Sequence, residues 1–183
     1  MTSVGSGGTG WQDDERLRTW RLFLEARTRI VRRMDDDLQA NHQLSIEWYD
    51  VLVQLFEAGG RRTMGNLASA LLISPSNCSR LVDRMAADGL VRREADTADG
   101  RVKHAVLTDE GFAVLKAASP THLASIERYF TSFLGGDPGS VLDLFSQILG
   151  ALEFGPGATE SSSSGTTIEP AEGPNDPGRG GGT

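Results

Sequence analysis

The sequence is poor in the residues that build disulfides and metal sites. Its 183 residues include one cysteine, Cys78, and three histidines, His42, His104 and His122. A single cysteine excludes an internal disulfide framework. The histidines are far apart in sequence, and none has a second ligand-type residue at the helical spacing that zinc sites favour. We therefore expect no metal site.

Signals for membrane insertion and secretion are also missing. No apolar run approaches the roughly 20 residues that a helix needs to cross a bilayer. The first ten residues, MTSVGSGGTG, have neither the basic start nor the apolar run of a secretory signal. We expect a soluble, cytoplasmic protein without a membrane partner.

The common sequence motifs of catalysis are absent as well. There is no phosphate-binding glycine loop, no nucleophile elbow and no helix with paired histidines. The glycine runs at the two ends lack the strand-then-helix context that a nucleotide-binding loop requires. We expect no catalytic residues, no cofactor and no enzyme activity.

The two ends of the chain differ in composition from the middle. Residues 1–10 are rich in glycine, serine and threonine, and residues 155–183 contain one large aliphatic side chain, Ile168. Such segments cannot bury a core, so we expect both to be disordered and the tail to be a passive extension rather than a binding segment. The folded domain is expected to span residues 11–154.

The middle of the chain carries helix signals followed by a hairpin. Apolar spacing, capping residues and glycine stops predict helices over 13–40, 46–58, 64–72, 75–88, 108–133 and 138–153. Pro120 is expected to kink or divide the fifth of these. Residues 90–94 and 103–107 are expected to pair as strands around a polar turn. The pattern predicts a mainly α fold with a small β-hairpin.

Charge is unevenly distributed along the chain. The segment from Gly60 to His104 holds eight basic and five acidic residues, in a chain whose net charge is −7. A locally basic segment on an acidic body fits contact with phosphates through one face.

The predicted helix that starts after Ser74 has two distinct faces. One face is apolar and consists of Cys78, Leu81, Val82 and Met85. The other is polar and consists of Ser76, Asn77, Arg80, Asp83, Arg84 and Ala87. Short polar side chains and free N–H groups near a helix start suit the major groove of DNA, where Arg80 can contact guanine or a phosphate. The alternative is an ordinary solvated face.

The neighbouring elements favour the DNA-binding interpretation. A short helix, a tight turn and a second helix form a helix-turn-helix, and the following hairpin adds Arg93, Arg101 and Lys103. An arginine on such a hairpin tip can enter a minor groove. Asp99 either orients an arginine of the hairpin or closes the turn, and the two roles are compatible.

Several stretches together resemble the MarR (multiple antibiotic resistance regulator) family of bacterial regulators. They are SPSNCSRLVDRMAADGLVRR, DTADGR and VLTDEG, with YDVLVQL and NLASALLIS before them. The resemblance implies a winged helix-turn-helix homodimer that binds an inverted repeat in double-stranded DNA and is released by a small molecule or an oxidant. It places the DNA-binding lobe at about 45–108 and the dimerisation helices at about 13–40 and 109–153.

The resemblance also assigns roles to individual residues. The recognition-helix positions that would contact DNA are Ser74, Ser76, Asn77, Ser79 and Arg80. Arg101 matches the wing-tip arginine, with Arg93 and Lys103 as further wing contacts. Asp83 and Arg84 match an Asp-Arg pair that braces helix and wing, a role we extend to Asp99.

The signal that would release the DNA is less well marked in the sequence. The family's ligand pocket lies near the start of the second helix, where the candidates are Arg16, Trp20, His42, Trp48 and Tyr49. Aromatic walls with a few polar groups suit a small aromatic or carboxylate ligand. The alternative is that Trp20 and Trp48 belong to the core.

Cys78 falls on the packed helix face, so we interpret it as a small buried hydrophobe rather than an oxidation sensor.

These features predict a dimeric, ligand-responsive, sequence-specific transcriptional regulator, most simply a repressor. The competing hypothesis is a winged-helix module that binds proteins and has lost its affinity for DNA.

Overall fold

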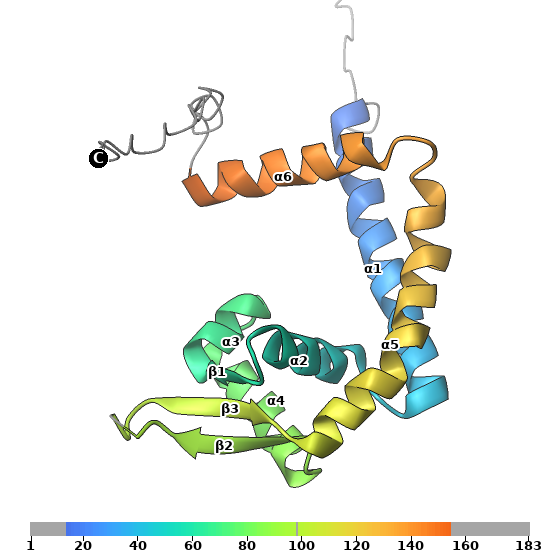
Figure 1. Ribbon diagram of the computed structural model, residues 1–183. Helices are drawn as coiled ribbons and strands as arrows, with labels where there is room; N and C mark the ends of the chain where they lie inside the picture. Colours follow the sequence, from blue (N-terminus) through green and yellow to red (C-terminus); the bar gives the residue numbers. More distant parts are fainter. Residues whose placement is uncertain (1–13, 98, 155–183) are drawn as a thin grey trace, which may run out of the picture. The chain divides into compact units, whose positions relative to one another are not determined.

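The computed structural model describes residues 14–97 and 99–154. The segments predicted to be disordered, 1–10 and 155–183, lie outside the described residues. The chain divides into two compact units between Gly135 and Gly136, and each is described by itself. In chain order the elements are α1 (Glu15–His42), α2 (Ile46–Glu57), β1 (Arg61–Thr63), α3 (Met64–Ala70), α4 (Pro75–Ala87), β2 (Val91–Ala95), β3 (Lys103–Leu107), α5 (Asp109–Tyr129), the 3-10 turn η1 (Thr131–Phe133) and α6 (Pro138–Phe154) (Figure 1).

Capping side chains fix where the helices begin, as the sequence predicted. Ser45, Thr63, Ser74 and Thr108 each accept a backbone N–H three residues on, at 3.0–3.3 Å. Pro75 occupies the first turn of α4, where a missing N–H removes no helical hydrogen bond. Because these caps are read from short local patterns, the predicted helix starts agree with the structure to within about two residues.

The sheet has one strand more than the sequence predicted. Its order is β1-β3-β2, and both pairings are antiparallel. The hairpin of β2 and β3 confirms the prediction, whereas β1 was missed. Gly59 and Gly60, both at positive φ, turn the chain after α2, and the Gly60 carbonyl accepts the Leu107 N–H at 2.8 Å. A three-residue polar strand of this kind has no alternation to detect, because it is formed by a partner distant in sequence.

The core of the lobe lies between α2, α3, α4 and the sheet. Its largest fully buried side chains include Leu52, Leu55, Leu67 and Met85. The predicted packed face of α4 is confirmed, since Cys78, Leu81, Val82 and Met85 are all buried. The polar face of α4 is thereby left outside.

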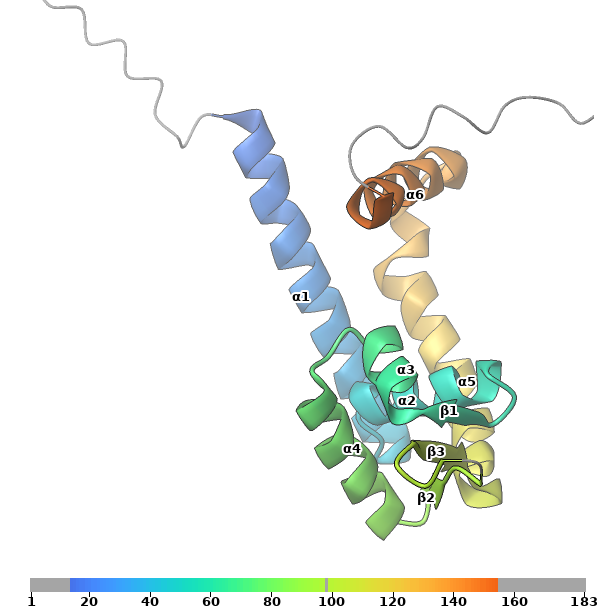
Figure 2. The ribbon, with the colours of Figure 1, turned by 90° about the vertical axis from the view of Figure 1, so that its left-hand side faces the viewer.

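Helices α1 and α5 run side by side away from this lobe and diverge with distance from it (Figures 1 and 2). The buried Ser125 hydroxyl donates to Asp37 at 2.7 Å, and Arg128 lies 3.8 Å from the same carboxylate. Asp35 accepts the Ile46 N–H at 2.8 Å and so joins the end of α1 to the start of α2. Among the described residues, no helix is long and apolar enough to cross a membrane.

Pro120 does not divide α5, contrary to one of the two outcomes expected. The helix is continuous from Asp109 to Tyr129. Pro120 and Lys116, whose carbonyl loses its helical partner, are both exposed, so water can satisfy that carbonyl. The helix also ends four residues before Phe133, which belongs to η1 instead.

The second unit contributes α6. Asp137 accepts the Ser140 N–H at 3.3 Å, which confirms the predicted cap-then-proline start. Its large apolar side chains are mostly exposed in the single chain: Leu142, Leu144, Ile148, Leu149 and Leu152.

Gly111 is the position where α5 touches the hairpin most closely. A Cβ atom there would lie 2.0 Å from the Leu90 carbonyl oxygen and 3.0 Å from a Leu107 methyl group. Thr108, which caps the helix, also donates to the Leu90 oxygen at 2.8 Å. The start of α5 is therefore packed directly onto the base of the wing.

We expect Gly111→Ala to lower the free energy of unfolding by about 3 kcal/mol, because backbone atoms must move to admit the methyl group. Urea denaturation measures this change. Gly65→Ala in α3 is the matched control, since its Cβ would meet nothing within 4 Å. It should stabilise the protein by about 0.5–1 kcal/mol. Equal effects of the two substitutions would contradict the close packing at Gly111.

The turn between α3 and α4 holds an apolar residue in a strained conformation. Leu72 has φ of 56° and is 92% exposed. It follows the C-cap Leu71, and the Ile73 N–H reaches back to the Ala68 carbonyl at 3.1 Å, as in a Schellman motif. Glycine is the usual residue at this position because it has no Cβ to clash.

Leu72→Gly should raise the free energy of unfolding by about 1 kcal/mol, since it removes left-handed strain and gives up no burial. Thermal and urea unfolding measure the gain. Leu72→Ala keeps the strain and is expected to change stability by less than about 0.5 kcal/mol. A loss of stability in the glycine variant would show that Leu72 makes stabilising contacts.

Candidate nucleic-acid interface

The N-terminal end of α4 presents short polar side chains to solvent. Ser74 caps the helix, and its hydroxyl lies 3.2 Å from that of Ser76. Asn77 and Arg80 are exposed one turn apart, and the Asn77 amide oxygen accepts from the Arg80 guanidinium. Arg80 is therefore held in one orientation before any partner binds, which lowers the entropy lost on binding.

The wing is closed by a turn that Asp99 organises. The Asp99 carboxylate accepts the Arg101 N–H at 2.9 Å. The backbone carbonyl of Asp99 accepts the Val102 N–H, also at 2.9 Å. Of the two roles considered for Asp99, these contacts correspond to closing the turn. The side chains of Arg101 and Lys103 are exposed beside it.

Arg93 connects the wing to the recognition helix. Its guanidinium lies 3.1 Å from the Asp83 carboxylate and donates to the Ser79 hydroxyl at 2.8 Å. Asp83 thus forms an ion pair from the recognition helix to the wing, and the bracing role that the sequence assigned to it stays a prediction. Arg93 and Ser79 were both expected to contact DNA, and the structure places them against each other in this brace.

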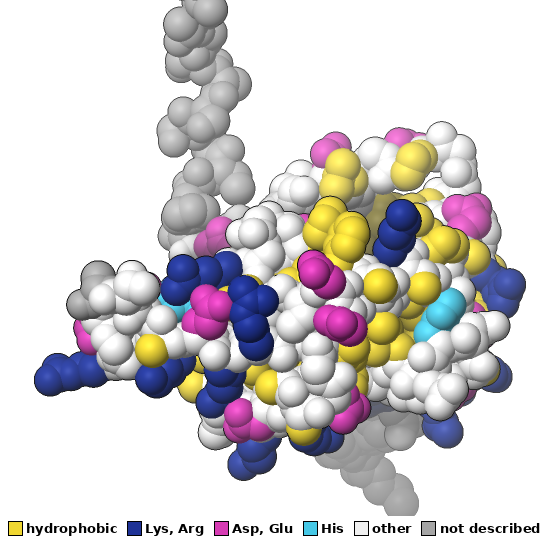
Figure 3. Space-filling model, turned by 60° about the horizontal axis from the view of Figure 1, so that its bottom comes forward, with side chains coloured by type: hydrophobic (Ala, Val, Ile, Leu, Met, Phe, Trp, Pro, Cys, Tyr) yellow, Lys and Arg dark blue, Asp and Glu magenta, His cyan; other side chains and the backbone are white. Residues whose placement is uncertain are grey.

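A groove runs between α3, the start of α4 and the wing. It is lined by Thr63, Met64, Gly65, Asn66, Pro75, Ser79, Arg93, Arg101, Val102 and Lys103. In the space-filling view, Lys and Arg side chains gather at the projecting side of the lobe (Figure 3). The groove therefore brings Ser79, one of the predicted helix contacts, together with the predicted wing contacts Arg93, Arg101 and Lys103.

The turn end of the hairpin has a polar cluster that the sequence did not reveal. The Arg61 guanidinium lies 3.2 Å from Nδ1 of His104 and 3.8 Å from the Asp96 carboxylate. His104 also lies 3.7 Å from Asp96. Arg61 belongs to β1, so the missed strand is also the reason that this cluster was missed.

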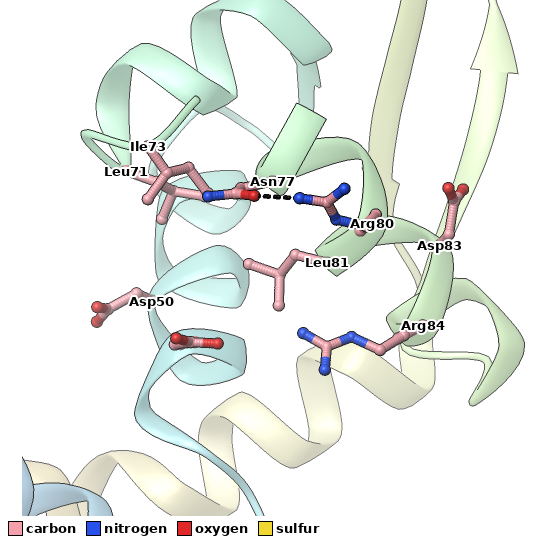
Figure 4. Close-up of a pocket in the computed structure, with 9 residues that line it drawn as sticks. Asp50, Leu71, Ile73, Asn77, Arg80, Leu81, Asp83 and Arg84 are labelled. Carbon is pink, nitrogen blue, oxygen red and sulfur yellow. Dashed lines mark hydrogen bonds between the residues drawn. The ribbon is translucent and has the colours of Figure 1, made fainter. Parts of the chain in front are cut away.

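On the other side of α4 lies a hollow of about 590 Å³. The third member of the predicted brace, Arg84, faces this hollow together with Arg80, while Asp50 faces it from α2 (Figure 4). Glu47 of α2 and three apolar side chains, Leu71, Ile73 and Leu81, complete its main lining.

The residues predicted to bind a ligand separate into two places. His42 lies 2.8 Å from the Thr121 hydroxyl, and Tyr49 donates to Ser119 at 3.3 Å, so both meet α5. Trp48 is half-buried against the core, as the alternative proposed.

Arg16 and Trp20 lie far from that junction. Arg16 is paired with Asp14 at 2.8 Å, and Trp20 is 55% exposed and stacked on Phe23. Trp20 and His42 are 22 positions apart in one continuous helix, which separates them by about 33 Å. Trp20 is therefore neither a core residue in the single chain nor close to Tyr49.

His122 is a residue of this junction that the sequence reasoning considered only as a metal ligand. Its ring centre lies 4.2 Å from that of Tyr49, and its Nδ1 atom is buried without a hydrogen-bond partner. Burial lowers the pKa of His122. Its position three residues after Ser119, on the same face of one helix, was the sequence signal that could have placed it at this junction.

Among residues 14–97 and 99–154 no cluster of three metal-ligand side chains is present.

Cys78 is fully buried, and its sulfur faces the Met64 carbonyl at 3.8 Å. Burial raises the pKa of the Cys78 thiol, against a smaller opposing effect of Arg93. The predicted placement on the packed face is confirmed, and a raised pKa disfavours the reactive thiolate.

Comparison with known proteins gives the family. A MarR-family model matches residues 42–102. AbsC, a MarR family transcriptional regulator from Streptomyces coelicolor with a known crystal structure, is 33% identical in sequence to this chain. The match covers 81% of this chain and 100% of the AbsC chain, with a TM-score of 0.72. The chain belongs to the MarR family.

Other similar proteins are described as transcriptional regulators as well. Sco3205 from Streptomyces coelicolor, solved in complex with DNA, is 31% identical over 78% of this chain and 89% of its own, with a TM-score of 0.71. The HTH-type transcriptional regulator YkoM of Bacillus subtilis is 30% identical over 44% of this chain. The chain spans 52% to 64% of the curated relatives that it matches.

The predicted MarR resemblance and winged helix-turn-helix fold are thus confirmed. The predicted contacts Ser76, Asn77 and Arg80 are exposed on α4, and Asn77 and Arg80 line the hollow beside α2. Arg93 ties the wing to α4 through Ser79 and Asp83.

We expect Asp83→Ala to weaken DNA binding, although loss of a negative charge alone would strengthen it. The substitution frees Arg93 and loosens the wing. A double-mutant cycle of Asp83→Ala and Arg93→Ala should give a coupling of about 0.5–1 kcal/mol in stability, because the pair is partly exposed.

The exposed pair Arg92–Glu94, at 2.7 Å within one strand, is the control. Glu94→Ala leaves the brace intact and should not weaken DNA binding. Tighter DNA binding by Asp83→Ala would rule out the brace as a determinant of affinity.

Proposed function

We propose that this MarR-family chain is a homodimeric, sequence-specific DNA-binding repressor, released from an inverted-repeat operator by a small ligand. The observation that carries the proposal is the exposed polar end of α4, tied through Arg93 to a basic wing. Sco3205, which is 31% identical, was solved bound to DNA. That relationship favours DNA binding over the competing idea of a protein-binding module.

Each part of the interface has a proposed role. Ser76, Asn77 and Arg80 enter the major groove, where small polar groups and a fixed guanidinium can read base edges. Arg101 and Lys103 contact the adjacent backbone or minor groove from the wing. Arg93 serves the interface indirectly, by holding the wing against Ser79 and Asp83.

A second copy of the chain is the proposed partner of the exposed apolar side chains. They lie on α1, α5, η1 and α6: Trp20, Leu22, Phe23, Leu24, Leu123, Phe133, Leu142, Leu144, Ile148, Leu149 and Leu152. Soluble monomers rarely expose so many large apolar groups, and association of two copies would bury them. Trp20 then serves dimerisation rather than ligand binding.

The proposed trigger is a small aromatic or carboxylate compound that binds at the junction of α1, α2 and α5. His42, Tyr49 and His122 supply aromatic surface and hydrogen-bonding groups there. A buried ring nitrogen without a partner, as in His122, gains most from a ligand that hydrogen-bonds to it. Arg16 lies too far along α1 to reach this site within one chain.

Fluorescence anisotropy tests the function directly. The full-length protein is titrated into labelled DNA from its own upstream region and into a random duplex of equal length, at two salt concentrations. We expect tighter binding to the upstream DNA, with affinity falling steeply with salt because phosphates are neutralised. Footprinting should then show half-sites about 10 bp apart, centre to centre.

Arg101→Ala tests the contribution of the wing to DNA binding. It should weaken operator binding by about 1–3 kcal/mol. Lys116→Ala removes an exposed charge from α5 and serves as the control. Equal, weak binding to both duplexes, with little salt dependence, would refute sequence-specific regulation from this site and return attention to protein partners.

A further inference from the structure

The hollow beside the recognition helix brings two acidic and two basic side chains together. Glu47 and Asp50, one turn apart on α2, line it opposite Arg80 and Arg84 of α4. Figure 4 shows the two guanidinium groups on α4 and Asp50 on α2, with the Asp50 carboxylate directed away from them. The predicted DNA contacts Asn77 and Arg80 therefore border this hollow as well as the DNA-facing surface.

Asp50 carries an unneutralised charge at this place. Among the described residues it has no lysine, arginine or histidine within ion-pair distance. Asp50 is exposed, yet desolvation by the protein around its carboxyl group, with the charge of Glu47, raises the pKa of Asp50 to about 6. Its charge is thus easily removed near neutral pH, whereas an ordinary aspartate stays ionised.

We propose that Asp50, supported by Glu47, is a counter-charge that sets the DNA affinity of the recognition helix and takes up a proton when DNA binds. This inference rests on the proposed function. The negative charges of the ionised carboxylates repel DNA phosphates that approach Arg80 and Arg84. Protonation of Asp50 removes part of this repulsion.

The sign of the pH dependence follows from this arrangement. Phosphates brought near Asp50 disfavour its ionised form, so its pKa in the complex lies above its value in the free protein. DNA affinity then rises as pH falls through the interval between the two pKa values. Below about 6, where the free protein already holds the proton, affinity becomes independent of this group.

The other groups around the hollow are few. Glu47 faces Asp50 from the same helix, and Arg80, Asp83 and Arg84 face it from α4. The turn before α4 contributes only Leu71 and Ile73. Asp83 is engaged by Arg93, so Glu47 is the remaining acid that can share the role with Asp50.

The test is the DNA affinity of full-length wild type and Asp50→Asn from pH 8 to pH 5, at low salt. At pH 7.5 the variant should bind operator DNA about fivefold more tightly, as expected for removing one charge at intermediate range. At pH 5.5 the two proteins should bind alike. Glu57→Gln, an exposed acid at the far end of α2, is the matched control and should follow wild type. Glu47→Gln should show an intermediate gain.

A second measurement reads the proton itself. The carboxyl carbon of Asp50 is followed by NMR during a pH titration, and its disappearance in Asp50→Asn gives the assignment. We expect a pKa near 6 in the free protein and an upward shift when operator DNA is added.

The outcomes separate the two proposals. If wild type binds operator DNA with the same pH profile as Asp50→Asn, or if DNA leaves the Asp50 titration unchanged, the counter-charge role of Asp50 is wrong. The proposed function as a DNA-binding regulator would still stand. If wild type binds neither operator nor random DNA, the proposed function falls, and this inference falls with it.

Discussion

Burial of one face of α4 decides how the rest of this surface is arranged. With Cys78, Leu81, Val82 and Met85 packed inside the lobe, the intervening positions must face outward. Those positions carry Asn77, Arg80, Asp83 and Arg84, and they divide between two neighbours. Asp83 turns to the wing through Arg93, while Arg80 and Arg84 border the hollow shared with α2. A single helix thus connects the wing and the acidic side of α2 to the surface proposed to meet DNA.

Local signals in the sequence were sufficient for the helix starts and for the polar face of α4. Caps such as Ser45 and Ser74 act through hydrogen bonds to residues three positions on, so the sequence alone contains both partners. β1 was missed for the opposite reason. Its three residues become a strand only through pairing with β3, more than 40 positions later. The cluster of Arg61, Asp96 and His104 depends on that pairing and could not be read either.

Side-chain roles were harder to predict than secondary structure. Arg93 and Arg101 are both arginines of the hairpin, yet the strand register directs one toward α4 and leaves the other at the exposed tip. The aromatic candidates for a ligand site were grouped by type, and the length of α1 then placed Trp20 far from Tyr49. His122 joined the site because α5 continues through Pro120, which the sequence left open.

Helix α5 is continuous and connects the hairpin to the junction with α1 and α2. Its first turn is locked onto the hairpin, where Gly111 leaves no room against Leu90, and its middle carries Ser119, Thr121 and His122 into the junction with α1 and α2. Because one helix carries both contacts, a compound bound beside Tyr49 that tilts α5 would also change the angle at which the wing is held.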